Sequence, residues 1–98
     1  MAKPGATVKF QLYVADSTPN SAQALANIKA IRSSYFPDSE LEIIDVFRNP
    51  ERASKGAILL TPTLLKVAPQ PTCKIVGSLT DRESVLRALG VVEEIHEL

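Results

Sequence analysis

The chain has few of the residues on which thiol, metal and nucleophilic chemistry depend. Its 98 residues include one cysteine, Cys73, and one histidine, His96. One cysteine excludes an internal disulfide, and one histidine in an acidic terminal stretch can complete neither a multi-histidine metal site nor a Ser-His-Asp arrangement. The four glycines are scattered, so the sequence has no glycine-rich phosphate loop. We therefore expect no catalytic residue, no metal and no cofactor.

Strong net charge and long apolar runs are also lacking. The 11 basic and 11 acidic residues cancel, so the chain has no overall positive field to hold nucleic acid or an anionic membrane. No apolar run approaches the ~20 residues of a membrane-spanning helix, and Met1–Gly5 has neither a signal core nor a transit pattern. We expect one cytoplasmic domain over residues 1–98 that binds neither nucleic acid nor membrane.

The first half of the chain predicts a strand, a helix and a second strand. Apolar and polar residues alternate over 8–14, which is typical of a strand with one apolar face. Thr18 is a suitable N-cap for a helix over 19–36, because Pro19 fits the first helical position. The dense apolar run over 41–47 predicts a parallel strand covered on both faces. Together they form a right-handed βαβ unit.

The second half predicts a short helix, a hairpin and a last helix. Asn49 and Pro50 can start a helix that ends near Gly56. Thr80 and Glu83 form a capping box, and Gly90 can terminate the helix that follows. The elements expected are a helix over 50–56, strands over 63–67 and 73–77, and a helix over 80–89, before an acidic tail over 93–98.

The order βαβαββα predicts a thioredoxin-like three-layer α/β domain. Thr61-Pro62-Thr63 precedes the third strand, where such folds place a cis peptide bond. The loop expected to face Pro62, residues 16–19, contains no cysteine, although a thiol oxidoreductase needs one at the start of the first helix. Cys73 lies in the far hairpin and is interpreted as a packing residue.

A set of short motifs carries a family resemblance over Phe10 to Glu94. The motifs are Leu12-Tyr13-Val14-Ala15, Thr18-Pro19-Asn20-Ser21, Ile44-Asp45-Val46, Asn49-Pro50, Thr61-Pro62-Thr63-Leu64 and Leu79-Thr80-Asp81-Arg82-Glu83. Each motif alone is ordinary turn, cap or strand chemistry, but together they are specific. With them, the chain resembles the KaiB family of circadian clock proteins.

The resemblance implies a non-catalytic protein that binds the N-terminal ring of the hexameric ATPase KaiC, helps to time its phosphorylation and displaces a sensor kinase. It also implies metamorphism, because KaiB relatives hold either a tetrameric ground state of order βαββααβ or the thioredoxin-like monomer that binds KaiC. Interconversion would be slow if Pro62, Pro69 or Pro71 must isomerise, since the barrier is about 20 kcal/mol.

Two departures from the family pattern bear on which fold is populated. Ala88 stands where the clock proteins carry glycine, and alanine is worth about 1 kcal/mol over glycine inside a helix. Gly90 stands where they carry aspartate, and it makes a clean helix stop. We therefore expect the thioredoxin-like state to dominate.

Other departures bear on the partners. Glu40-Leu41-Glu42 is acidic where relatives have small or basic residues on the strand that pairs with KaiA or an input kinase, and Gln23 and Ala57 also replace basic residues. This argues against KaiA as a partner. The chain could be a KaiB-like paralogue from an organism with KaiC but no KaiA, used in stress timing or hourglass control.

The residues expected to bind the partner surround the short second helix. Arg48, Arg52 and Lys55 would supply electrostatic contacts to an acidic partner surface, while Tyr13 and Thr18 would shape the face beside Pro62. Two alternatives stay open at this point: a thioredoxin-like redox or glutathione-dependent enzyme, and the KaiB-like sensory domain of a histidine kinase.

Overall fold

A computed structural model describes residues 7–15 and 18–91. The acidic tail, with His96, and part of the loop over 16–19 lie outside the described residues. The order βαβαββα predicted from the sequence is confirmed, and the alternative order βαββααβ is not the one present. The elements are β1 (Lys9–Val14), α1 (Pro19–Tyr35), β2 (Glu40–Asp45), α2 (Pro50–Lys55), β3 (Thr63–Ala68), β4 (Cys73–Val76) and α3 (Arg82–Ala88).

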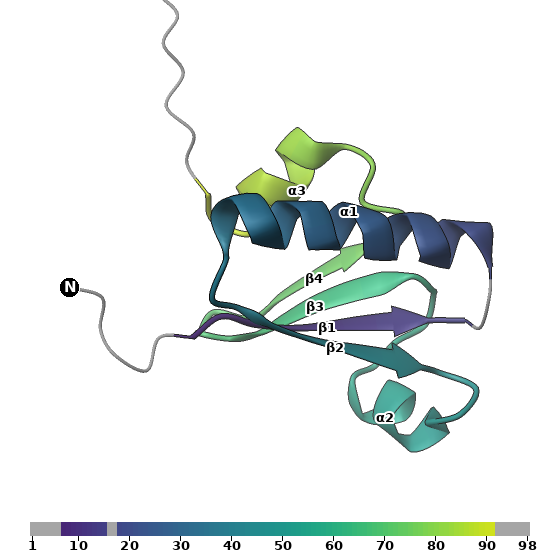
Figure 1. The fold of residues 1–98 in the computed structure, drawn as a ribbon. Coiled ribbons are helices and arrows are strands. Elements are labelled where there is room, and N and C mark those ends of the chain that lie inside the picture. The colour runs from purple at the N-terminus through teal and green to yellow at the C-terminus, as the bar shows by residue number, and fades with distance from the viewer. Residues whose placement is uncertain (1–6, 16–17, 92–98) are drawn as a thin grey trace, which may run out of the picture.

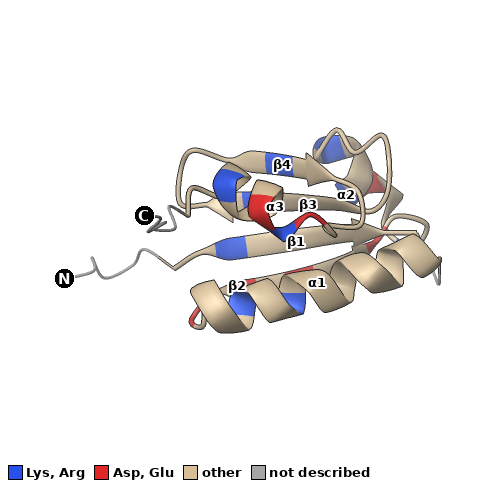
Figure 2. Ribbon diagram, turned by 90° about the horizontal axis from the view of Figure 1, so that it is seen from above, with Lys and Arg blue, Asp and Glu red and all other residues tan. Residues whose placement is uncertain are grey.

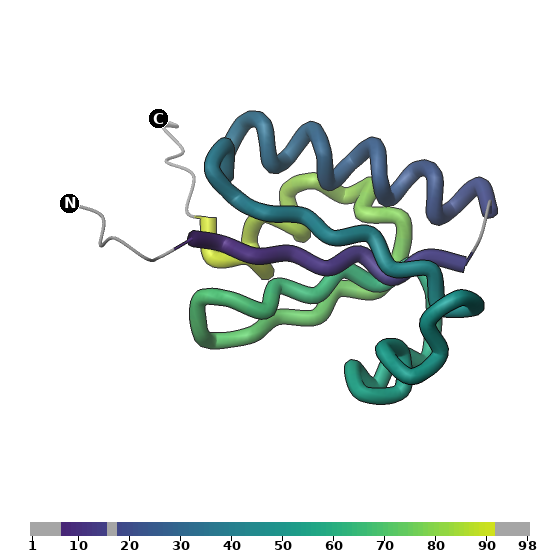
Figure 3. The backbone as a smooth tube through the Cα atoms, turned by 60° about the horizontal axis from the view of Figure 1, so that its bottom comes forward, coloured from purple at the N-terminus to yellow at the C-terminus, as the bar shows by residue number. Residues whose placement is uncertain are grey.

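The four strands form one sheet in the order β2-β1-β3-β4. β2 runs parallel to β1, whereas β3 is antiparallel to both of its neighbours. Helices α1 and α3 lie on one face, and α2 lies on the other side of the sheet, under the C-terminal end of β2 (Figure 1). This topology brings together the last residues of β1, β2 and β4 and the first residue of β3. We call this the α2 end of the sheet (Figure 3).

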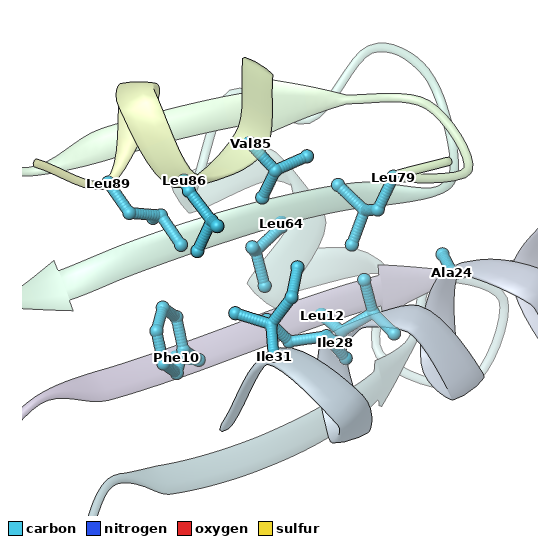
Figure 4. Close-up of a cluster of buried hydrophobic side chains, with 10 residues drawn as sticks. All are labelled: Phe10, Leu12, Ala24, Ile28, Ile31, Leu64, Leu79, Val85, Leu86 and Leu89. Atoms are coloured by element: carbon cyan, nitrogen blue, oxygen red, sulfur yellow. The ribbon is translucent and has the colours of Figure 1, made fainter. Parts of the chain in front are cut away.

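The core lies between the sheet and helices α1 and α3 (Figure 4). Phe10 and Leu12, which alternate along β1 as the period-two pattern predicted, point into it, and β3 contributes Leu64. None of its members is more than 7% exposed, and Leu12, Ile28 and Leu64 are fully buried. The cluster consists of Phe10, Leu12, Ala24, Ile28, Ile31, Leu64, Leu79, Val85, Leu86 and Leu89.

The prediction that the second strand is covered on both faces is wrong. β2 lies at the edge of the sheet, with β1 as its one neighbour among the described strands. Its register pairs Leu12 with Ile43 and Tyr13 with Ile44. Ile44, beside Tyr13, is 2% exposed, but Ile43, beside Leu12 on the face that carries α1 and α3, is 45% exposed, so the helices cover this face incompletely at its edge. A dense apolar run thus reflects a strand with one well-covered residue rather than two covered faces.

The cap of the last helix is also shifted from its predicted position. Thr18 caps α1 as expected, since its hydroxyl accepts a hydrogen bond from the Ser21 N–H at 3.3 Å. In α3 the N-cap is Asp81 rather than Thr80, because the Asp81 carboxylate accepts from both the N–H and the hydroxyl of Ser84. The Thr80 hydroxyl shares a 2.7 Å hydrogen bond with Ser78 instead. An ionised carboxylate is the better acceptor, so the helix starts one residue later.

The end of α3 agrees with the sequence. Gly90 has φ +87° and donates its N–H to the Arg87 carbonyl, while Val91 donates to Leu86. This left-handed glycine terminates the helix directly after Ala88 and Leu89. None of the described helices has the length and apolar character that a membrane span requires.

The expected cis peptide bond before Pro62 is present. The bonds before Pro69 and Pro71, in the loop between β3 and β4, are cis as well. Pro62 is buried at the α2 end of the sheet, whereas Pro69 and Pro71 are exposed at the opposite end.

Candidate functional site

Large apolar side chains are exposed at the α2 end of the sheet. Phe47, in the loop before α2, is 73% exposed, and Leu59 and Leu60, in the loop after it, are 91% and 63% exposed. Val76, the last residue of β4, is 53% exposed. Apolar groups that are both large and gathered at one end of a small domain are typical of an interaction surface. We refer to these four residues as the exposed apolar group.

The loop that carries Phe47 is held by a carboxylate. Asp45, the last residue of β2, accepts hydrogen bonds from the N–H groups of Phe47 at 2.8 Å and Arg48 at 3.3 Å. The Asn49 side chain donates to the Asp45 carbonyl at 3.1 Å. This turn fixes the backbone from which Phe47 and Arg48 project, so little of that backbone must be ordered when a partner binds.

The loop that carries Leu59 and Leu60 is held from β3 and β4. The Lys74 ammonium donates to the Ala57 carbonyl at 3.0 Å, and the Thr63 hydroxyl donates to the Leu60 carbonyl at 2.6 Å. The Gly77 N–H also donates to Pro62 at 2.8 Å. The exposed leucines therefore lie on a loop whose two ends are hydrogen-bonded to the sheet.

Basic residues surround α2 on the same end of the molecule (Figure 2). Arg48 precedes the helix and Lys55 is its last residue, and both are exposed. Neither makes an ion pair within the part of the chain that the structure describes. These two predicted docking residues present their charges to solvent.

Arg52 is in a different situation from the other two cations. Its guanidinium donates to both carboxylate oxygens of Glu42 on β2, at 2.9 Å and 2.8 Å. The hydrogen bonds from Arg52 lower the pKa of the Glu42 carboxyl, so the carboxylate stays charged at neutral pH. The sequence predicted Arg52 as a partner contact, and the structure places it in a bidentate pair across two elements.

Tyr13 lies beneath α2 and is 3% exposed. Its hydroxyl donates to the Gln11 side chain at 2.8 Å, and burial raises its pKa. A Cβ atom added at Gly56 would lie 3.2 Å from this hydroxyl and 3.3 Å from the Ile58 side chain. The end of α2 therefore sits close to Tyr13 because residue 56 has no side chain, which the sequence had indicated only as a helix stop.

The predicted site residues fall into two places. Thr18, at the start of α1, and Pro62, at the start of β3, share the α2 end with the three cations. Ala88 and Gly90 lie toward the opposite end, where the Cys73 thiol donates to the Ala88 carbonyl at 3.3 Å. The single thiol is thus remote from the helix start at which a redox fold would need it.

The α2 end presents apolar and basic side chains to solvent. Within the described ranges, no group of three or more His, Cys, Asp or Glu side chains could hold a metal ion. What the surface offers is an exposed apolar group on fixed loops, flanked by Arg48 and Lys55. Sequence reasoning found the cations but not the exposed apolar group, since apolar runs beside strands usually indicate burial.

Comparison with known sequences gives a consistent result. The profile of the KaiB domain matches residues 11–91. The circadian clock oscillator protein KaiB of Microcystis aeruginosa is 48% identical over 93 residues, which cover 93% of this chain and 89% of that protein. The circadian clock oscillator protein KaiB1 of Synechocystis is 46% identical over 93 residues, which again cover 93% of this chain and 89% of that protein.

Solved structures agree on the fold. The N-terminal domain of SasA from Synechococcus elongatus superposes with a TM-score of 0.72 at 24% identity, covering 98% of this chain and 95% of that one. The thioredoxin Deadhead from Drosophila melanogaster gives a TM-score of 0.72 at 12% identity, covering 91% of this chain and 84% of that one. The thioredoxin-like architecture expected from the sequence is therefore confirmed.

Proposed function

The chain belongs to the KaiB family, and we propose that it is a non-catalytic clock or timing regulator which docks on the N-terminal ring of a KaiC-like hexameric ATPase. Its relatives are named as clock oscillator proteins, which is a regulatory role. We further propose that residues 1–98 act as a single cytoplasmic domain, without a cofactor.

The exposed apolar group is the observation that supports docking at the α2 end. Apolar side chains at the centre of an interface supply most of the affinity, while surrounding charges guide the encounter and set specificity. Phe47 and Leu59 would fill depressions on the ring, and Arg48 and Lys55 would face acidic residues around them. Tyr13 would act indirectly, by supporting α2 from below, and Thr18 by ordering the start of α1.

The thioredoxin-like monomer would be the form that binds the ring. The family's second fold, a tetramer of order βαββααβ, would be the alternative state of the same chain. α2 contains no buried residue, so few packing contacts oppose a rearrangement of this part of the molecule. The acidic edge strand, with Glu40 and Glu42, continues to argue against KaiA as a partner.

A binding titration on the ATP-loaded ring tests this proposal. Replacing Leu59 and Leu60 by serine should weaken binding at least tenfold, since each loses apolar contact worth about 1 kcal/mol or more. Reversing the charges of Arg48 and Lys55 to glutamate should weaken binding and lower its dependence on salt. Lys29→Glu is the control for a charge reversal elsewhere, because Lys29 is an exposed cation of α1.

Two outcomes would contradict the proposal. Undiminished ring affinity in the leucine double variant would exclude the α2 end as the docking surface. Turnover of insulin or glutathione disulfide that disappears in Cys73→Ser would indicate a redox enzyme instead.

A further inference from the structure

We infer that Glu42 competes, within the chain, with partner carboxylates for the guanidinium of Arg52, and so limits how tightly the α2 end docks. This inference rests on the proposed function, because it concerns the same surface. It concerns regulation, because Glu42 occupies the position on Arg52 that an acidic residue of the ring would take.

The pair has the geometry that a partner carboxylate would have to reproduce. Both terminal nitrogens of Arg52 donate to Glu42, one to each oxygen, at 2.9 Å and 2.8 Å. This side-by-side arrangement is the preferred way for arginine to bind a carboxylate. An acidic residue on a partner can therefore engage Arg52 in the same manner only by displacing Glu42.

Both members are accessible to such an exchange. The Arg52 and Glu42 side chains are 36% and 52% exposed, so solvent and a partner can reach them. The two residues belong to different elements and are ten positions apart in the chain, so the pair is not fixed by local backbone geometry. If Arg52 leaves, the Glu42 carboxylate can be hydrated at the sheet edge without a large penalty.

The charges around α2 determine how many cations the exchange would make available to a partner. While the pair is intact, Arg48, just before α2, and Lys55, at its end, make no ion pair among the described residues, and the nearby Lys74 ammonium donates to the Ala57 carbonyl. Glu51, in the first turn of α2, is exposed and opposes them. Removing the Glu42 charge would present a third cation, with its donors unoccupied, to an acidic partner surface.

The sheet provides a matched control for this change. Glu40 is exposed on the same strand, two residues from Glu42 and therefore on the same face. Within the described residues it makes no ion pair. Glu40→Gln and Glu42→Gln remove the same charge from nearly the same place, but the second variant alone frees Arg52.

The test measures ring affinity for wild type, Glu42→Gln, Glu40→Gln, Arg52→Gln and the double variant Glu42→Gln with Arg52→Gln. Glu42→Gln should bind about threefold or more tightly than wild type, with a steeper salt dependence, whereas Glu40→Gln should change affinity less than twofold. In the Arg52→Gln background, Glu42→Gln should have no further effect beyond that of Glu40→Gln. Equal effects of the two single glutamate variants, or weaker binding by Glu42→Gln, would overturn the inference.

A second measurement on the isolated protein separates this inference from the proposed function. NMR signals of the Arg52 guanidinium should show hindered rotation in wild type and Glu40→Gln, and free rotation in Glu42→Gln. Titration with hexaglutamate should shift these signals at lower peptide concentration in Glu42→Gln than in wild type. If wild type does not bind the ring but the two proteins still differ in the peptide titration, the proposed function fails and the competition between Glu42 and partner carboxylates stands. Identical titrations of wild type and Glu42→Gln would refute the competition.

Discussion

The core between the sheet and helices α1 and α3 differs from the α2 end in how much apolar surface it buries. On the side of α1 and α3, the ten residues of the core cluster are at most 7% exposed (Figure 4). At the α2 end, the helix has no buried residue, and the loops on either side of it expose Phe47, Leu59 and Leu60. Burial in the core contributes most of the free energy that stabilises the fold, whereas the apolar side chains at the α2 end are left exposed to a binding partner.

A small domain can therefore hold a stable fold and still offer a changeable surface. Elements with few buried contacts open at a lower free energy than the core does. Because α2 is held mainly by turns, by Tyr13 below it and by the Glu42–Arg52 pair, changes there should affect binding more than stability.

Leu64 and Leu65 are neighbours on β3 that point to opposite faces, so they compare the two sides directly. Leu64→Ala should lower the free energy of unfolding by about 3 kcal/mol, because Leu64 is fully buried in the core. Leu65→Ala should cost less than half as much, since Leu65 is only half-buried. Urea denaturation measures both free energies of unfolding. Equal losses would show that the face of the sheet on which Leu65 lies is as well packed as the core.

The end of α3 should be sensitive to substitution at Ala88 and Gly90. Gly90→Asp should cost about 1 kcal/mol, because φ is +87° and the left-handed region is unfavourable for residues with a side chain. Ala88→Gly should cost up to about 1 kcal/mol more through loss of helix propensity. Amide exchange at Val85 and Leu86 reports the stability of α3.

Ala22→Gly is the control for these two variants, since Ala22 is exposed in α1 and has the same propensity change. It should leave exchange in α3 unchanged. Unaltered protection in the Gly90→Asp and Ala88→Gly double variant would show that α3 does not depend on these residues. It would also remove the reason to expect the thioredoxin-like state to dominate.

Leu59→Ser should separate binding from stability. Leu59 is 91% exposed, so the free energy of unfolding should change by no more than about 0.5 kcal/mol. Affinity for the KaiC-like ring should nevertheless fall. Thermal unfolding and a ring-binding titration on the same sample give both values, and a large stability loss would mean that this loop belongs to the folding core.

The smallest expected effect concerns the pH dependence of the Glu42–Arg52 pair. The pKa of Glu42 is lowered in the folded state, so the pair contributes stability at neutral pH that is lost as pH falls through that lowered value. Wild type should therefore be slightly more stable than Glu42→Gln at neutral pH, and the difference should vanish in acid. Urea midpoints at the two pH values measure it; a difference that grows in acid would have the wrong sign.

Local signals made much of the fold predictable from the sequence. The alternation over β1, the Thr18 cap of α1 and the Gly90 stop of α3 each depend on residues close together in the chain. The edge position of β2 depends on which strands lie beside it, and the run around Ile43 and Ile44 cannot indicate that. The cap at Asp81 rather than Thr80 depends on which of two adjacent side chains accepts from the first turn of α3, and both residue types are common caps.

The candidate site was less predictable, for the same reason. Composition and spacing indicated that Arg48, Arg52 and Lys55 would be charged and exposed. They could not indicate that Glu42 would reach Arg52, because the contact requires β2 and α2 to fold back on each other. Nor could they indicate that Leu59 would be exposed, since its apolar run resembles a buried strand.

The open edge of β2 has a consequence for how copies of this protein behave when concentrated. An unpaired strand edge is a template for fibre growth, and natural proteins protect such edges with charge. Glu40 and Glu42 lie on that edge, so two copies meeting strand to strand would bring carboxylates together. A double variant, Glu40→Gln with Glu42→Gln, would leave the same edge without this protection, and aggregation should start there.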